Sequence, residues 1–139
     1  MTGAPVVIDT HIVVAGLLTK NAASPVARVL DGMLSAAFSF VLSEPLLAEY
    51  RQVLVRPPLR KLHRLTVDEV DLILTDIAHH AVVMKPLPGP PAPDPGDQLL
   101  WDLLAAHSGL RLVTGDLALL RAPAMQGRVV SAREFVDAD

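Results

Sequence analysis

Short runs of apolar residues alternate along the chain with longer stretches in which apolar positions recur at helical spacing. Val6-Val7-Ile8 is a continuous β-branched run, which is typical of a strand buried on both faces of a sheet. Comparable short runs predict four further strands, at Phe38–Leu42, Ala81–Met84, Leu110–Val113 and Arg128–Val130.

The segments between these strands begin with residues that favour helix starts. Ser24 precedes Pro25, an arrangement typical of an N-cap with proline at the first helical position, and Thr66 with Glu69 forms a capping-box pattern. The predicted helices lie near Ile12–Leu18, from Ser24 to about Ala37, and at Glu44–Val55, Thr66–His79, Asp97–Ser108, Asp116–Arg121 and Ser131–Val136. Pro57-Pro58 is predicted to end the helix that begins at Glu44.

Strands that alternate with helices predict a three-layer α/β/α sandwich with a mostly parallel sheet. The 139 residues fit one domain, residues 1–139, and the 51% of hydrophobic residues indicates a well-buried core. One segment departs from the alternation: Lys85–Asp97 holds six of the twelve prolines, so we expect an extended connection there.

Composition excludes several kinds of chemistry. There is no cysteine, so disulfides, thiolate zinc sites, iron–sulfur clusters and a cysteine nucleophile are excluded. The formal net charge is −3, so any contact with nucleic acid needs a local basic patch. The apolar run Pro5–Leu18 is interrupted by Asp9 and His11 and is too short to span a bilayer. We therefore expect no membrane segment, and a cytoplasmic location.

Four acidic residues lie near predicted strand-to-helix junctions: Asp9, Glu49, Asp97 and Asp116. Because the carboxyl ends of parallel strands meet at one edge of a sheet, we expect these side chains to converge there. Carboxylates at such close quarters repel one another unless a cation is bound, and an all-oxygen set suits Mg²⁺ or Mn²⁺. Such ions support phosphodiester cleavage.

Each acid also has an ordinary structural interpretation. Asp9 is compatible with a turn residue that ends a strand, and Asp97 and Asp116 with helix N-caps. Glu49 is compatible with a solvated helix residue, although it lies at the margin of the apolar stripe of its helix.

The ordered set of four acidic segments resembles the motifs of PIN domains. The segments are Val7-Ile8-Asp9-Thr10, Leu46–Leu54, Asp94-Pro95-Gly96-Asp97 and Val113-Thr114-Gly115-Asp116. The segments Arg56–Lys61 and Ser131–Val136 also resemble the branch of that family formed by toxins of toxin–antitoxin pairs.

The resemblance implies a PIN-like fold and a metal-dependent endoribonuclease of VapC-like type that cleaves single-stranded RNA. It implies catalytic roles for Asp9, Glu49, Asp97 and Asp116, with Asp9, Asp97 and Asp116 binding Mg²⁺ or Mn²⁺ and Thr114 as a supporting hydroxyl. The implied partners are RNA, a cognate antitoxin protein and a second copy of the chain.

Two positions differ from the usual family pattern: His11 replaces an asparagine and Gly96 an acid. His11 follows Asp9 by two residues, so a ligand, a proton donor or a substrate contact is compatible with its place. So is a purely structural hydrogen bond to the turn at Asp9.

A run of basic residues without an intervening acid extends from Arg51 to Arg64. It predicts an RNA-binding strip that includes Arg51, Arg56, Arg60 and Lys61, because cations beside a negative pocket suit a phosphodiester chain. A solvated connection between helices is the alternative.

Three functional classes remain open from the sequence. The first is a metal-dependent ribonuclease, and the second is a PIN-fold RNA- or protein-binding regulator without efficient catalysis. The third is an aspartyl phosphoacceptor, which the chain disfavours because His11 occupies the position of a required second acid and no lysine follows Lys85.

Overall fold

The computed structural model describes residues 4–138, so the ends of the predicted domain 1–139 lie outside the described residues. Within that range, five parallel strands form one sheet in the order β3-β2-β1-β4-β5. The strands are β1 (Val6–Ile8), β2 (Phe40–Leu42), β3 (Val82–Val83), β4 (Arg111–Val113) and β5 (Val129–Val130). The predicted α/β sandwich with a parallel sheet is confirmed.

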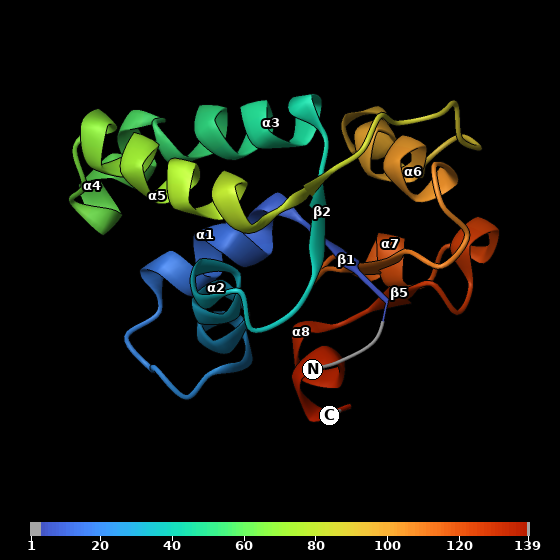
Figure 1. Ribbon diagram of the computed structural model, residues 1–139, viewed down its shortest axis with the longest axis horizontal. Helices are drawn as coiled ribbons and strands as arrows, with labels where there is room; N and C mark the ends of the chain where they lie inside the picture. The colour runs from blue at the N-terminus through green and yellow to red at the C-terminus, as the bar shows by residue number, and fades with distance from the viewer. Residues whose placement is uncertain (1–3, 139) are drawn as a thin grey trace.

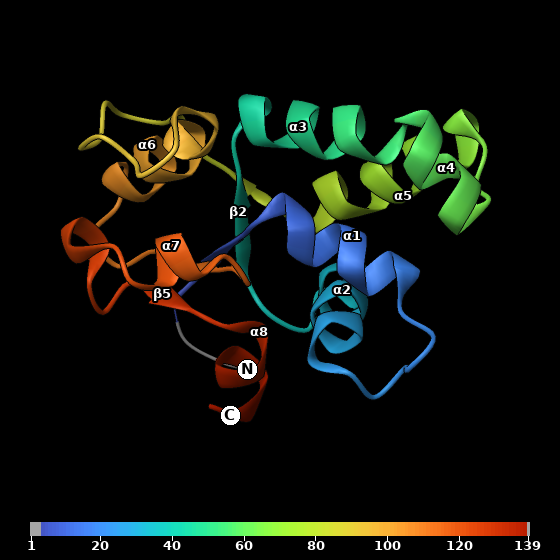
Figure 2. The same cartoon turned by 180° about the vertical axis from the view of Figure 1, so that it is seen from behind.

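Eight α-helices flank the sheet within the described residues. They are α1 (Thr10–Leu18), α2 (Pro25–Ser35), α3 (Glu44–Leu54), α4 (Pro57–His63), α5 (Val67–His80), α6 (Gln98–Ala105), α7 (Leu117–Leu120) and α8 (Ala132–Asp137). Strands β1 and β2 run between α6 on one side and α1, α2 and α5 on the other, as the two opposite views show (Figure 1, Figure 2). None of the described helices is long and apolar enough to cross a membrane.

The helix starts follow the capping residues of the sequence. The Ser24 hydroxyl accepts a hydrogen bond from the Ala27 N–H, with Pro25 at the first position of α2. Thr66 and Glu69 form a reciprocal capping box at the start of α5, and Ser131 and Glu134 form another at the start of α8. Each cap satisfies backbone N–H groups that have no partner within the helix.

One helix was not predicted. α3 ends at Leu54, close to the predicted end at Val55, but Pro57-Pro58 also begins α4. Proline at the first turn needs no backbone donor, and its φ angle already suits a helix. Arg56 lies in extended conformation between α3 and α4, and Arg64 ends α4 in the left-handed conformation at φ 61°. The basic run is therefore helical over most of its length.

The core lies between the sheet and its helices and is mainly aliphatic. The strand residues Val7, Ile8 and Leu112 have no exposed surface, and neither has Trp101 of α6. α6 packs against β1 and β4, and α3 packs against α1 and α5. This packing fixes the positions of α3 and α6 relative to the carboxyl ends of β1 and β4.

Tyr50 joins α3 to the end of β1. Its hydroxyl donates a hydrogen bond to the carbonyl oxygen of Ile8, the residue before Asp9, and its side chain is fully buried. Burial raises the pKa of Tyr50 well above its usual range, and the charges of Asp9 and Glu49 raise it further. The phenol therefore remains a protonated donor.

Replacing Tyr50 with Phe should lower the free energy of unfolding by about 1–3 kcal/mol, because a buried carbonyl loses its hydrogen-bond donor. Chemical denaturation at neutral pH measures the change. Equal stability of the Tyr50→Phe variant and the wild type would contradict this role of the hydroxyl.

Candidate active site

The register of β1 and β4 brings the first and last acidic segments together. Ile8 pairs with Val113, so Asp9 and Thr114 emerge side by side at the carboxyl edge of the sheet. The Asp9 N–H donates to the Val113 carbonyl oxygen at 3.0 Å, and the Thr114 hydroxyl donates to Asp9 Oδ2 at 2.7 Å. The chain runs from β1 to β2 on one side of this pair and from β4 to β5 on the other. Open α/β folds bind ligands at the point where the connections diverge in this way.

Thr114 links two of the acids. While its hydroxyl donates to Asp9, the same oxygen accepts a hydrogen bond from the Asp116 N–H at 3.1 Å. Asp116 also caps α7, since its Oδ1 accepts from the Ala118 N–H at 2.8 Å. Thr114 is fully buried and Asp9 nearly so, which leaves both side chains little freedom.

Glu49 reaches the same place from α3. The Thr10 hydroxyl, at the start of α1, donates to Glu49 Oε2. Glu49 is half-buried, in agreement with its position at the margin of the apolar stripe of α3. Thr10 directly follows Asp9 in the chain, so its hydrogen bond holds Glu49 close to Asp9.

Asp97 lies at the end of the proline-rich connection Lys85–Asp97, which hydrogen bonds to α6 hold in place. Asp102 of α6 accepts hydrogen bonds from the Gly89 N–H and the Gln98 side-chain amide, both at 2.9 Å. Gln98 in turn donates to the Pro90 carbonyl oxygen and accepts from the Ala92 N–H. A Cβ atom at Gly89 would lie 2.7 Å from the Trp101 carbonyl oxygen, so this close approach requires glycine.

Four acids from distant segments line a single cavity of about 300 Å³. Asp94, whose Oδ1 accepts from the Gly96 N–H at 2.7 Å, is a fifth. The other lining residues are Thr10, His11, Val53, Arg56 and Gly96. Asp9, Glu49, Asp97 and Asp116 thus converge as the sequence predicts, and His11 lies exposed at the rim.

Mutual repulsion is visible in the acid–base behaviour of Asp97. Burial raises its pKa to about 6, and the charges of Asp9, Asp116, Asp94 and Glu49 contribute to the same shift. Asp97 is the N-cap residue of α6 but makes no side-chain capping hydrogen bond. Its carboxylate therefore has no capping hydrogen bond to offset this repulsion.

The carboxylates that line the cavity are the kind of ligand that a hard divalent cation prefers. The raised pKa of Asp97 shows that its charged form is unfavourable without a cation. Among residues 4–138, however, no three acidic or histidine side chains are arranged to hold one ion together. Hydrogen bonds occupy one oxygen each of Asp9 and Glu49. The residues fit the ion chemically, and side-chain movement is needed to bring three of them onto it.

The predicted basic strip divides into separate parts. Arg56 lines the acidic cavity, whereas Arg60 and Lys61 line a different groove on α4. Arg51 is not brought together with them: it pairs with Asp71 of α5 at 2.8 Å, and this hydrogen bond lowers the pKa of the Asp71 carboxyl. Arg51 lies in a mostly apolar hollow of about 520 Å³ between α3 and α5.

Sequence reasoning did not find the residues that hold the acids. Thr10 and Tyr50 each contact a segment far away in the chain, so no local pattern predicts them. Gln98 contacts the irregular connection just before it, where no repeating pattern identifies its partners. Asp102 of α6 anchors the connection that carries Asp97. The one available signal is adjacency, since Thr10 follows Asp9 and Tyr50 follows Glu49.

The PIN domain family model matches residues 5–118, a range that contains all four acids. The chain therefore belongs to the PIN domain family. PIN domains are generally nucleases, a class of hydrolases, and they typically use divalent metal ions. A comparison with curated proteins finds no match.

Replacing Asp97 with Asn should stabilise the metal-free protein at high pH but not at low pH. The folded-state pKa of about 6 lies above the ordinary value of 3.8, so the wild type loses stability as pH rises through this interval. We expect a gain of about 1 kcal/mol at pH 8, since solvent screens a partly exposed carboxylate, and almost none at pH 4.

Denaturation in EDTA from pH 4 to pH 8 measures this gain. Asp31→Asn removes an exposed carboxylate from α2 and is the matched control, for which no comparable rise with pH is expected. A gain for Asp97→Asn that is the same at both ends of the range would contradict the proposed repulsion.

Proposed function

We propose that this protein is a metal-dependent endoribonuclease that cleaves single-stranded RNA. The observation that carries the proposal is the convergence of four carboxylates from four separate segments on one cavity that also contains Arg56. Membership of a family of nucleases supports the general reaction class.

In this proposal Asp9, Asp97 and Asp116 hold Mg²⁺ or Mn²⁺, and Glu49 completes the catalytic carboxylates. The bound ion would supply activation of water and stabilisation of negative charge on the scissile phosphate. Thr114 fixes the orientation of Asp9, and Thr10 fixes that of Glu49. Both hydroxyls are buried, so they keep the two carboxylates directed toward the cavity while the RNA is cleaved.

Two residues at the cavity serve the substrate rather than the ion. The Arg56 guanidinium binds a phosphate next to the scissile one, and it offsets part of the repulsion between the carboxylates and a polyanion. The exposed His11 contacts the RNA or donates a proton to the leaving oxygen. Arg60 and Lys61 extend the positive surface beyond the cavity.

We also propose that the nuclease is the toxin of a toxin–antitoxin pair and acts in the cytoplasm. The support is the resemblance of Arg56–Lys61 and Ser131–Val136 to that branch of the family; the second segment lies beyond the residues that the family model matches. The expected protein partners are a cognate antitoxin and a second copy of the chain.

A specific observation favours a second function, that of an RNA- or protein-binding PIN domain without efficient catalysis. Within residues 4–138 no three acids are arranged around one ion, and His11 and Gly96 replace residues usual in the family. Such a protein would bind RNA and leave it intact.

Asp116→Asn distinguishes the two functions. Asparagine retains the cap on α7, so the variant should fold as the wild type does. Its cleavage of single-stranded RNA in Mn²⁺ should fall by on the order of 100-fold or more, as expected when a charged group that stabilises the transition state is removed.

The assay follows a labelled RNA with and without Mn²⁺, and Asp76→Asn on the outer side of α5 is the matched control with normal cleavage expected. Absence of cleavage by the wild type, with RNA binding retained, would favour the binding protein. Equal cleavage by wild type and Asp116→Asn would exclude Asp116 from the mechanism.

A further inference from the structure

A second hollow of the surface lies on α4, outside the acidic cavity. This groove of about 410 Å³ is lined by Arg60, Lys61 and Arg64 together with Pro57, Leu65 and Thr66. Its lining therefore contains three cations and no acid. The ion pair found among residues 4–138 joins Arg51 to Asp71. Arg60, Lys61 and Arg64 therefore form no ion pair with a carboxylate in that range.

The groove is connected to the acidic cavity by a row of arginines. The Arg60 N–H donates to the Arg56 carbonyl oxygen at 3.0 Å, and the Arg64 N–H donates to the Arg60 carbonyl oxygen at 2.9 Å. Each arginine therefore follows the previous one by a single helical turn. With a rise of about 1.5 Å per residue, the row extends about 12 Å from Arg56 at the cavity to Arg64 at the far end of the groove.

The end of this row is held in a fixed conformation. His63 Nε2 lies 2.8 Å from the Leu54 carbonyl oxygen, and its Nδ1 accepts from the Leu65 N–H at 2.9 Å. The two bonds together join the end of α4 to the end of α3 and to the turn before α5. Arg64, at φ 61°, is thereby held between two anchored neighbours.

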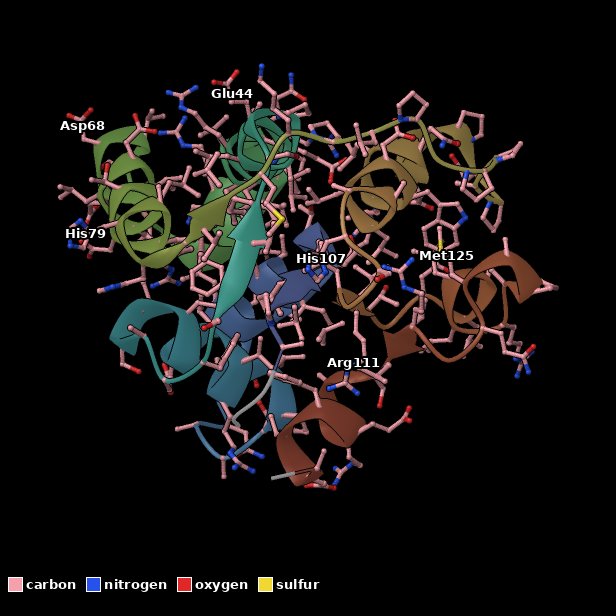
Figure 3. All side chains as sticks on the ribbon, turned by 45° about the vertical axis from the view of Figure 1, so that its right-hand side comes forward. Glu44, Asp68, His79, His107, Arg111 and Met125 are labelled. Carbon is pink, nitrogen blue, oxygen red and sulfur yellow. The ribbon has the colours of Figure 1, made fainter. Side chains whose placement is uncertain are left out.

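Two acids lie near the groove, at the start of α5, but neither lines it. The Glu69 carboxylate accepts from the Thr66 N–H in the capping box of α5. Asp68, on the same helix, points outward into solvent (Figure 3). The lining of the groove itself is cationic and suits an anionic chain that also reaches the acidic cavity.

We propose that the α4 groove is a phosphate-binding subsite for the same RNA strand that enters the acidic cavity, at a distance from the bond that is cut. The inference rests on the proposed function and extends it: the strand leaves the cavity at Arg56 and follows the arginine row, so its backbone phosphates meet Arg60, Lys61 and Arg64. Recognition is of the phosphates, because the groove lining contains no aromatic residue for base stacking.

The test uses a variant in which the groove cations are neutralised, Arg60→Gln/Lys61→Gln/Arg64→Asn. All three side chains are exposed, and asparagine tolerates the left-handed conformation at position 64. The matched control, Lys20→Gln/Arg28→Gln/Arg133→Gln, removes the same charge from exposed positions outside the groove. Thermal unfolding confirms that both variants are folded.

Binding of a fluorescent single-stranded RNA of about 12 nucleotides is measured in EDTA over a series of salt concentrations. The groove variant should bind at least about tenfold more weakly than the control, and the slope of log K against log salt should fall by about 2, as expected for three lost phosphate contacts at 0.7 each. Equal affinity and slope for groove variant and control would overturn the proposal.

No RNA binding by the wild type at low salt would also overturn it. Tighter binding of polyglutamate than of RNA at the same ionic strength would assign the groove to an acidic protein instead.

A cleavage assay in Mn²⁺ separates this inference from the nuclease proposal. If both hold, the groove variant has a raised KM and an unchanged kcat, because the groove is remote from the reacting atoms. If only the nuclease proposal holds, KM is unchanged as well. If the protein is not a nuclease, neither form cleaves RNA, and the difference in binding in EDTA still decides the role of the groove.

Discussion

Carboxylates that share a small cavity repel one another, and this fold has to hold four of them together. The consequence is clearest at Asp97, whose pKa rises to about 6 through burial and the charges of its neighbours. The convergence begins with the parallel sheet, since residues that come after β1 and β4 must emerge at the same edge. α3 and the connection before α6 bring Glu49 and Asp97 to the same cavity. The geometry that brings these carboxylates together therefore opposes folding.

Hydrogen bonds hold the acids and the segments that carry them in place against this repulsion. Thr114 and Thr10 donate hydroxyl hydrogen bonds to Asp9 and Glu49, and Tyr50 joins α3 to the strand that carries Asp9. The proline-rich connection is held by Asp102 and Gln98 of α6. Thr114 and Thr10 thus hold the two carboxylates in position, and the other contacts hold the segments that carry the acids.

Much of this arrangement could be predicted from local sequence. Short apolar runs predicted the strands, and Ser, Thr and Pro predicted most helix starts. The parallel order of the sheet then placed Asp9 and Asp116 at one edge. The contacts that depend on helix packing could not be predicted. Thr10 meets Glu49 only because α1 packs on α3, and Arg51 turns toward Asp71 only because α5 lies beside α3. Pro57-Pro58 was interpreted as a stop although it begins α4, since a proline pair has the same appearance at either end of a helix.

The central claim is that the four carboxylates form one electrostatic unit that a divalent cation stabilises. Thermal unfolding of the wild type at pH 7.5, in EDTA and in increasing Mn²⁺, tests it most directly. A ligand that binds only the folded state raises stability by about 2.7 kcal/mol at 100 times its Kd, so we expect Tm to rise by several degrees and to keep rising with the Mn²⁺ concentration. A Tm that is identical in EDTA and in millimolar Mn²⁺ would contradict the claim.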